Sequence, residues 1–111
     1  MKVSVRTLDD GEACLLTVEG EVDVTTAPRL RTELSSRIER GCTHVIIDLE
    51  KVGFIDSSGL GVLVGALRRA REKNGDLRIV CTKDVILNLF RITGLDKAFT
   101  IFADLRKAKR F

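Results

Sequence analysis

A run of apolar residues at positions 45–49 constrains the fold more than any other feature of this sequence. The run reads Val-Ile-Ile-Asp-Leu, and a nearly continuous series of β-branched side chains is typical of a strand that is buried on both faces. Residues 77–81, Leu-Arg-Ile-Val-Cys, form a second buried run. Strands of this type occur mainly in sheets that helices cover. The sequence therefore predicts an α/β protein.

Apolar residues recur at helical spacing in three segments beside these strands. The segments run from Pro28 to Arg40, from Ser57 to Asn74, and from residue 84 to residue 93. The hydroxyl groups of Thr25 and Thr26 could cap the first helix, and the hydroxyl of Ser57 could cap the second. Each pattern ends at or next to a glycine, which is a common helix stop. We therefore expect three amphipathic helices.

The beginning of the chain predicts a β-hairpin. Residues 3–7 alternate between apolar and polar side chains, residues 13–18 are mostly apolar, and an Asp-Asp-Gly turn signal lies between them. Short extended pieces are expected at 20–23 and at 100–102, and the second precedes a basic terminal stretch. Strands that alternate with helices imply partly parallel pairing with right-handed crossovers. We therefore predict a mixed β-sheet that is flanked by helices and opens with a β-hairpin.

Length and cysteine usage indicate the number of domains and the compartment. A chain of 111 residues leaves little room for a second core, so we expect one domain, residues 1–111. No apolar run approaches the roughly 20 residues that span a bilayer, and the N-terminus lacks the features of a signal peptide. Cys14, Cys42 and Cys81 are odd in number and widely separated, which favours reduced thiols without a disulfide framework. We therefore expect a cytoplasmic protein.

The net charge of +3 conceals an asymmetry between the two halves of the chain. Residues 1–66 carry 7 basic and 11 acidic side chains, whereas residues 67–111 carry 12 basic and 5 acidic ones. A basic half is compatible with nucleic-acid binding, but the chain has no Trp and no Tyr on which bases could stack. We therefore expect no direct contact with nucleic acid.

The segment most informative about function is Asp-Ser-Ser-Gly-Leu-Gly at 56–61, between a predicted strand and a predicted helix. Ser57 lies where a hydroxyl would cap the helix, and Asp56 adds a carboxylate in front of the helix N-terminus. Gly59 and Gly61 remove side-chain bulk from the first turn. The residues alone allow two interpretations, an exposed serine beside bare backbone or an ordinary N-cap whose glycines serve tight packing.

With this loop, the chain resembles the bacterial anti-sigma factor antagonists, which are built on the STAS domain. The resemblance extends over essentially the whole chain. Besides the opening hairpin and the loop, it rests on Gly20-Glu21-Val22-Asp23, Ile47-Asp48-Leu49 and Phe90-Arg91-Ile92-Thr93-Gly94-Leu95. The fold that the resemblance implies is a single STAS domain, which agrees with the mixed sheet predicted above.

The resemblance also implies a function and its residues. In this family the first serine after the loop aspartate, here Ser57, is phosphorylated by the anti-sigma factor, which is itself a serine kinase. The unphosphorylated form binds that kinase and frees the sigma factor, and a metal-dependent serine phosphatase reverses the modification. No cofactor is implied, because the partner kinase uses the ATP. The implied partner-binding residues are Asp23, Asp56, Ser58, Gly59, Leu60 and Gly61.

Charge explains how such a switch could work. A phosphoserine carries about −1.5 to −2 charges at neutral pH, and here it would lie beside Asp56 in the acidic half of the chain. Free N–H groups at the helix N-terminus could hold the phosphate, so the protein need not unfold. We therefore expect phosphorylation to release the kinase by changing the partner surface.

Other functions find less support in the sequence. A serine hydrolase would need G-x-S-x-G and a histidine base, yet the motif is absent and the only histidine, His44, precedes a buried strand. Cys42-Thr43-His44 lacks a usual zinc spacing, and the lysine-containing nucleotide loop is missing. We therefore expect neither catalytic residues nor a metal site. The alternative for function is a STAS scaffold or interaction module that is never phosphorylated.

Overall fold

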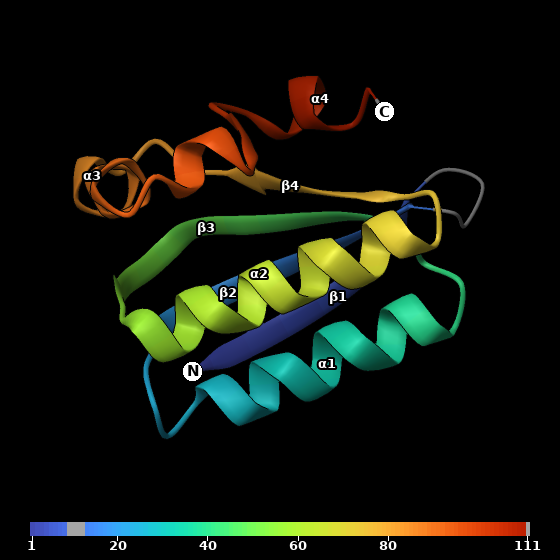
Figure 1. Cartoon of the computed structure of the whole chain (residues 1–111), viewed down its shortest axis with the longest axis horizontal. Helices are drawn as coiled ribbons and strands as arrows, with labels where there is room; N and C mark the ends of the chain where they lie inside the picture. Colours follow the sequence, from blue (N-terminus) through green and yellow to red (C-terminus); the bar gives the residue numbers. More distant parts are fainter. Residues whose placement is uncertain (9–12, 111) are drawn as a thin grey trace.

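In the part of the chain that the structure describes, five strands form one sheet in the order in which they occur along the sequence (Figure 1). The computed structural model describes residues 1–8 and 13–110. The strands are β1 (Lys2–Leu8), β2 (Ala13–Val22), β3 (His44–Ile55), β4 (Asp76–Val80) and β5 (Thr100–Phe102). β1 pairs antiparallel with β2, and the other neighbours pair in parallel. The predicted mixed sheet with its opening hairpin is confirmed, while the turn predicted at Asp9-Asp10-Gly11 lies outside the described residues.

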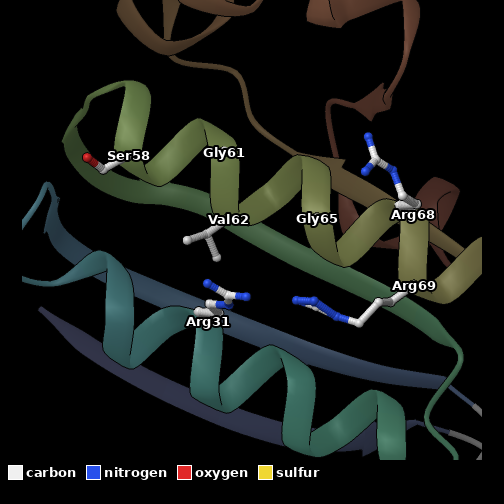
Figure 2. A pocket seen from close by; sticks show the side chains of 7 residues that line it. All are labelled: Arg31, Ser58, Gly61, Val62, Gly65, Arg68 and Arg69. Carbon is white, nitrogen blue, oxygen red and sulfur yellow. The ribbon is translucent and has the colours of Figure 1, made fainter.

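Helices connect the parallel strands. The helices are α1 (Ala27–Glu39), α2 (Ser57–Glu72), α3 (Asp84–Ile92) and α4 (Leu105–Ala108), and a 3₁₀ turn, η1, covers Leu95–Lys97. Right-handed crossovers between successive neighbouring strands place their helices on one face of the sheet. On this face α1 and α2 lie side by side (Figure 1), and Figure 2 shows the groove between them. In the described part of the chain, no helix combines the length and apolarity needed to cross a bilayer.

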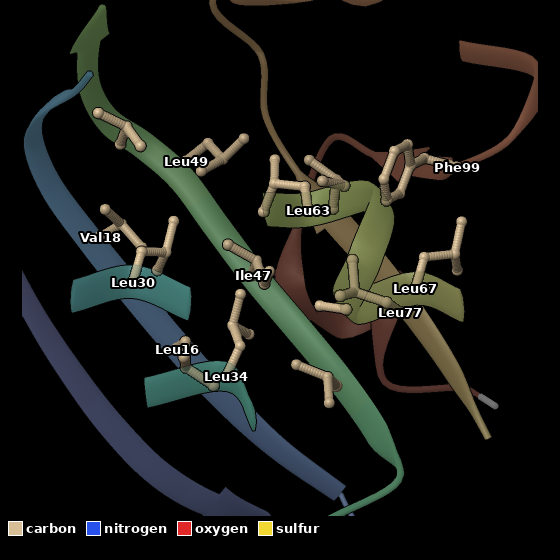
Figure 3. Packing of buried hydrophobic residues seen from close by; sticks show 14 of the residues in the cluster. Leu16, Val18, Leu30, Leu34, Ile47, Leu49, Leu63, Leu67, Leu77 and Phe99 are labelled. Carbon is tan, nitrogen blue, oxygen red and sulfur yellow. The ribbon is translucent and has the colours of Figure 1, made fainter. Parts of the chain in front are cut away.

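The main core lies between the sheet and these helices. β3 is its centre, because Ile47 and Leu49 are fully buried beneath Leu30 and Leu34 of α1 and Leu63 of α2 (Figure 3). A smaller cluster covers the opposite face of the sheet, where α4 packs. This cluster consists of Leu8, Leu15, Ile46, Val80 and Ala108. β3 is therefore buried on both faces, as its continuous apolar run predicts.

The helix caps differ from those predicted. Asp56, not Ser57, is the N-cap of α2, and Ser57 is the first helical residue. Thr26 occupies the N-cap position of α1 but makes no capping hydrogen bond there, since its hydroxyl lies against Asp23 instead. Aspartate is at least as good an N-cap as serine, so the carboxylate one residue earlier displaces the predicted hydroxyl.

The prediction of reduced cysteines without a disulfide is wrong for two of the three. Cys14 and Cys42 form a disulfide, with their Cα atoms 6.1 Å apart. They meet because Cys14 pairs opposite Val45, three residues after Cys42, when β2 and β3 align in parallel. Cys81 is a free, buried thiol, and burial raises its pKa.

Candidate functional site

The predicted loop lies at the edge of the sheet where β2 and β3 end together. Val22 pairs with Ile55, and the backbone N–H of Asp56 donates to the carbonyl of Val22 at 3.1 Å. Asp23 and Asp56, the residues that follow these two strand ends, are therefore brought to the same edge. The carboxyl ends of parallel strands are where α/β folds usually place their functional residues.

Asp56 fixes the start of α2. Its Oδ1 accepts hydrogen bonds from the backbone N–H groups of Ser58, at 2.9 Å, and Gly59, at 3.1 Å. Ser57 is left exposed on the first turn, and Ser58 is half-buried. A phosphate on Ser57 would find these two N–H groups already bound to Asp56. The prediction that free N–H groups at this helix end would hold the phosphate is therefore wrong for the N–H groups of Ser58 and Gly59.

The three residues after the serines divide between the core and the surface. Gly59 is buried, and a Cβ on it would lie 2.7 Å from the side chains of both Val22 and Ile55. The side chain of Leu60 is only 6% exposed. Gly61 is exposed, and a Cβ there would meet no atom within 4 Å. Gly59 and Leu60 therefore seat α2 on the sheet, whereas Gly61 leaves its outer surface bare.

Asp23 organises the turn between β2 and α1. Its Oδ1 accepts hydrogen bonds from the hydroxyl of Thr25 at 2.6 Å and from the backbone N–H groups of Thr25 and Thr26 at 3.0 and 3.1 Å. The hydrogen bond from the Thr25 hydroxyl is the main cause that lowers the pKa of Asp23 below its usual value of 3.8. These bonds support a loop-ordering role, and a partner contact through Asp23 stays a prediction.

Two exposed apolar side chains at this edge were not singled out as a pair by the sequence reasoning. Val24, next to Asp23, is 69% exposed, and Phe54, two residues before Asp56, is 49% exposed. Phe54 pairs with Glu21 across the two strands. In the sequence, Val24 could have been recognised because its apolar side chain belongs to neither the strand pattern before it nor the helix pattern after it. Exposed apolar groups that gather at one place often mark a protein–protein contact.

The residues considered for catalysis and metal binding lie elsewhere. His44 begins β3, and Ser57 follows the end of that 12-residue strand, so an extended strand of roughly 35 Å lies between them. His44 therefore cannot serve as a base for Ser57. Cys42 is bound to Cys14, which removes it as a metal ligand in the Cys42-Thr43-His44 segment.

Comparison with known proteins identifies the family. The model of the STAS domain matches residues 4–108. The chain belongs to the STAS family. It is 35% identical over 95 residues to the anti-sigma-B factor antagonist of Staphylococcus aureus (strain NCTC 8325 / PS 47), a match that covers 86% of this chain and 88% of that protein. It is 33% identical over 103 residues to the anti-sigma-B factor antagonist of Bacillus subtilis (strain 168), with 93% and 94% covered.

A solved structure supports the fold of this STAS domain. The structure of the Bacillus cell fate determinant SpoIIAA in its phosphorylated form superposes with a TM-score of 0.76 at 20% identity, over 98% of each chain. The family and the fold that the sequence predicts are thus confirmed. The STAS family to which this chain belongs thus includes the two anti-sigma-B factor antagonists named above.

Proposed function

We propose that phosphorylation of Ser57 switches this anti-sigma factor antagonist between two states. The unphosphorylated form binds an anti-sigma factor that is a serine kinase, and this binding frees a sigma factor. Phosphorylation of Ser57 releases the kinase, and a metal-dependent serine phosphatase restores the first state. The observation that carries the proposal is the exposed Ser57 on the first turn of α2, directly after the capping Asp56.

The geometry suits a switch that acts on a partner and not on the fold. Because Ser57 is exposed, a kinase can reach its hydroxyl without unfolding α2. The added charge would lie beside Asp56, whose Oδ1 already binds the N–H groups of Ser58 and Gly59. A dianion at an interface formed around a neutral hydroxyl loses hydration without compensation, which costs several kcal/mol, and about 1.4 kcal/mol is tenfold in affinity.

The apolar side chains of Val24 and Phe54 extend the proposed contact surface beyond the loop. Interfaces commonly have an apolar centre that often includes an aromatic side chain, surrounded by a polar rim. Here the two exposed apolar residues lie at the edge that also carries Asp23 and Ser57. We assign Asp23, Ser58 and Gly61 to the rim of this surface, while Gly59 and Leu60 support it from within.

In this proposal the protein is a regulator that has no catalytic residues and no cofactor of its own. The kinase supplies ATP and transfers the phosphate, and the antagonist supplies the acceptor hydroxyl. This exchange belongs in the cytoplasm, where sigma factors and ATP are present. The alternative, a STAS scaffold that is never phosphorylated, would bind its partners without any change at Ser57.

The test is phosphorylation by an anti-sigma factor kinase that co-purifies with the unphosphorylated protein. We expect incubation with the kinase and ATP to add one phosphate, detected by intact mass, to the unmodified chain and to the matched control Ser58→Ala. We expect Ser57→Ala to take up no phosphate while still binding the kinase. Full labelling of Ser57→Ala would refute the assignment, and absence of labelling on all three proteins would favour the scaffold.

A further inference from the structure

Positively charged side chains line the groove between α1 and α2. It has a volume of about 430 Å³ and lies between Arg31 of α1 and Arg68 and Arg69 of α2, with Ser58 toward one end. In Figure 2 the side chains of Arg31 and Arg69 point toward one another across the groove, whereas that of Arg68 points away from it. Two guanidinium groups that face the same space repel each other unless an anion lies between them.

Neither of the two facing arginines has a partner among the described residues. No described carboxylate forms an ion pair with Arg31 or Arg69, although Glu72 follows Arg69 by one helical turn. The Nε atom of Arg69 is also buried without a hydrogen-bond acceptor in the part of the chain that the structure describes. A buried donor without an acceptor destabilises the fold. The positive charges of Arg31 and Arg69 are therefore not compensated by any carboxylate of the described residues, and Arg69 Nε lacks an acceptor among them.

The wall formed by α2 leaves room for a ligand beside these arginines. Gly61 and Gly65, one helical turn apart, both line the groove. A Cβ at Gly61 would meet no atom within 4 Å, and one at Gly65 would come no closer than 3.8 Å, to the guanidinium of Arg69. A ligand can therefore approach the backbone of α2 while it contacts the guanidinium groups.

We propose that this groove binds a phosphate group, held between the guanidinium groups of Arg31 and Arg69. Guanidinium groups donate two parallel hydrogen bonds to phosphate oxygens, and a multiply charged anion compensates two facing cations better than a single charge does. The phosphate could be inorganic or part of a small phosphate ester. The inference does not depend on phosphorylation of Ser57, because Ser57 does not line the groove.

The test is a nuclear magnetic resonance titration of the uniformly ¹⁵N-labelled, unphosphorylated full chain. The probes are inorganic phosphate, pyrophosphate and glycerol phosphate, each with sodium chloride adjusted to hold ionic strength constant. We expect saturable shifts of the backbone amides of Gly61 and Gly65 and of the Nε–H of Arg69. Pyrophosphate should bind most tightly because it carries the most charge, and glycerol phosphate tells whether the groove admits an ester.

Two variants determine whether the arginines form the site. We expect Arg31→Gln combined with Arg69→Gln to weaken pyrophosphate binding at least tenfold, whereas the matched control Arg106→Gln on α4 should bind normally. If the double variant does not fold, each single variant should still weaken binding. Shifts that never saturate, shifts centred away from the groove, or equal affinities in the groove variants and the control would overturn the proposal.

Discussion

At the scale of single residues, Asp56 decides the geometry of the serine loop. Its carboxylate binds two N–H groups of α2, and its own N–H binds the end of β2. We expect Asp56→Ala to lower the free energy of unfolding by about 1 kcal/mol, the usual value of an N-cap. Ser57→Ala should change it by less than about 0.5 kcal/mol. Urea midpoints of the two variants test this, and a larger loss in Ser57→Ala would contradict the assignment of the cap.

Asp23 makes stability depend on pH through its loop. Hydrogen bonds from Thr25 and Thr26 lower the pKa of its carboxyl below 3.8. A group whose pKa is lowered by folding stabilises the native state above its unfolded pKa, and this contribution is lost as pH falls through the folded pKa. We therefore expect Asp23→Asn to have a lower Tm than the unmodified chain at pH 7 and at pH 5.

The lowered pKa of Asp23 also predicts that the difference in Tm between Asp23→Asn and the unmodified chain becomes smaller at pH values below 3.8. Thermal unfolding at pH 7, 5 and 3 measures it. Asp96→Asn is a suitable control, because Asp96 is exposed on η1. A difference that does not change between pH 7 and pH 3 would show that the hydrogen bonds of Asp23 contribute nothing through its charge.

At the scale of elements, the first turn of α2 packs closely on the sheet at Gly59, whereas Gly61 faces away from the sheet into open space. A Cβ on Gly59 would overlap Val22 and Ile55, and such overpacking costs about 1–3 kcal/mol. A Cβ on Gly61 meets open space, so alanine should stabilise the helix by about 0.5–1 kcal/mol. We expect Gly59→Ala to lower the denaturant midpoint and Gly61→Ala to raise it. If both raised it, Gly59 would not be a packing residue.

The helices and strands could largely be predicted because periodicity depends on residues close in the sequence. The sequence predicts the buried run of β3, the three longer helices and the hairpin, and the structure confirms them. The Cys14–Cys42 disulfide joins residues 28 positions apart, and it depends on the register of β2 against β3. No local pattern encodes that register.

The terminal helix α4 is a second feature that local sequence patterns do not predict. α4 has four residues, too few for a helix that is stable by itself. Arg78 of β4 holds it, because its guanidinium donates to the carbonyls of Ala108 and Arg110 at 3.1 and 2.6 Å. The ring of Phe102 lies 5.4 Å from the same guanidinium. The sequence shows only a basic stretch there, since the contacts that order it come from residues about 30 positions earlier.

At the scale of the whole molecule, the exposed large apolar side chains of the described residues fall into two groups. Val24 and Phe54 lie at the edge that carries Ser57, and Val85 and Ile92 lie on α3. Phe54 lies three residues before Ser57 and Val24 lies next to Asp23 in the chain, whereas the second group belongs to α3, which follows the neighbouring strand β4. If the partner binds around Ser57, a polar substitution in the first group should weaken binding, and one in the second should not.

Phe54 and Ile92 provide the matched pair for this comparison. Because both are exposed, at 49% and 76%, we expect Phe54→Ser and Ile92→Ser to change the free energy of unfolding by less than about 1 kcal/mol. Loss of an aromatic anchor typically costs 2 kcal/mol or more in binding, which corresponds to about 30-fold in affinity. We therefore expect Phe54→Ser to weaken kinase binding by about that factor, measured by isothermal titration calorimetry with the unphosphorylated proteins. Ile92→Ser should bind as the unmodified chain does, and a loss confined to Ile92→Ser would move the partner surface to α3.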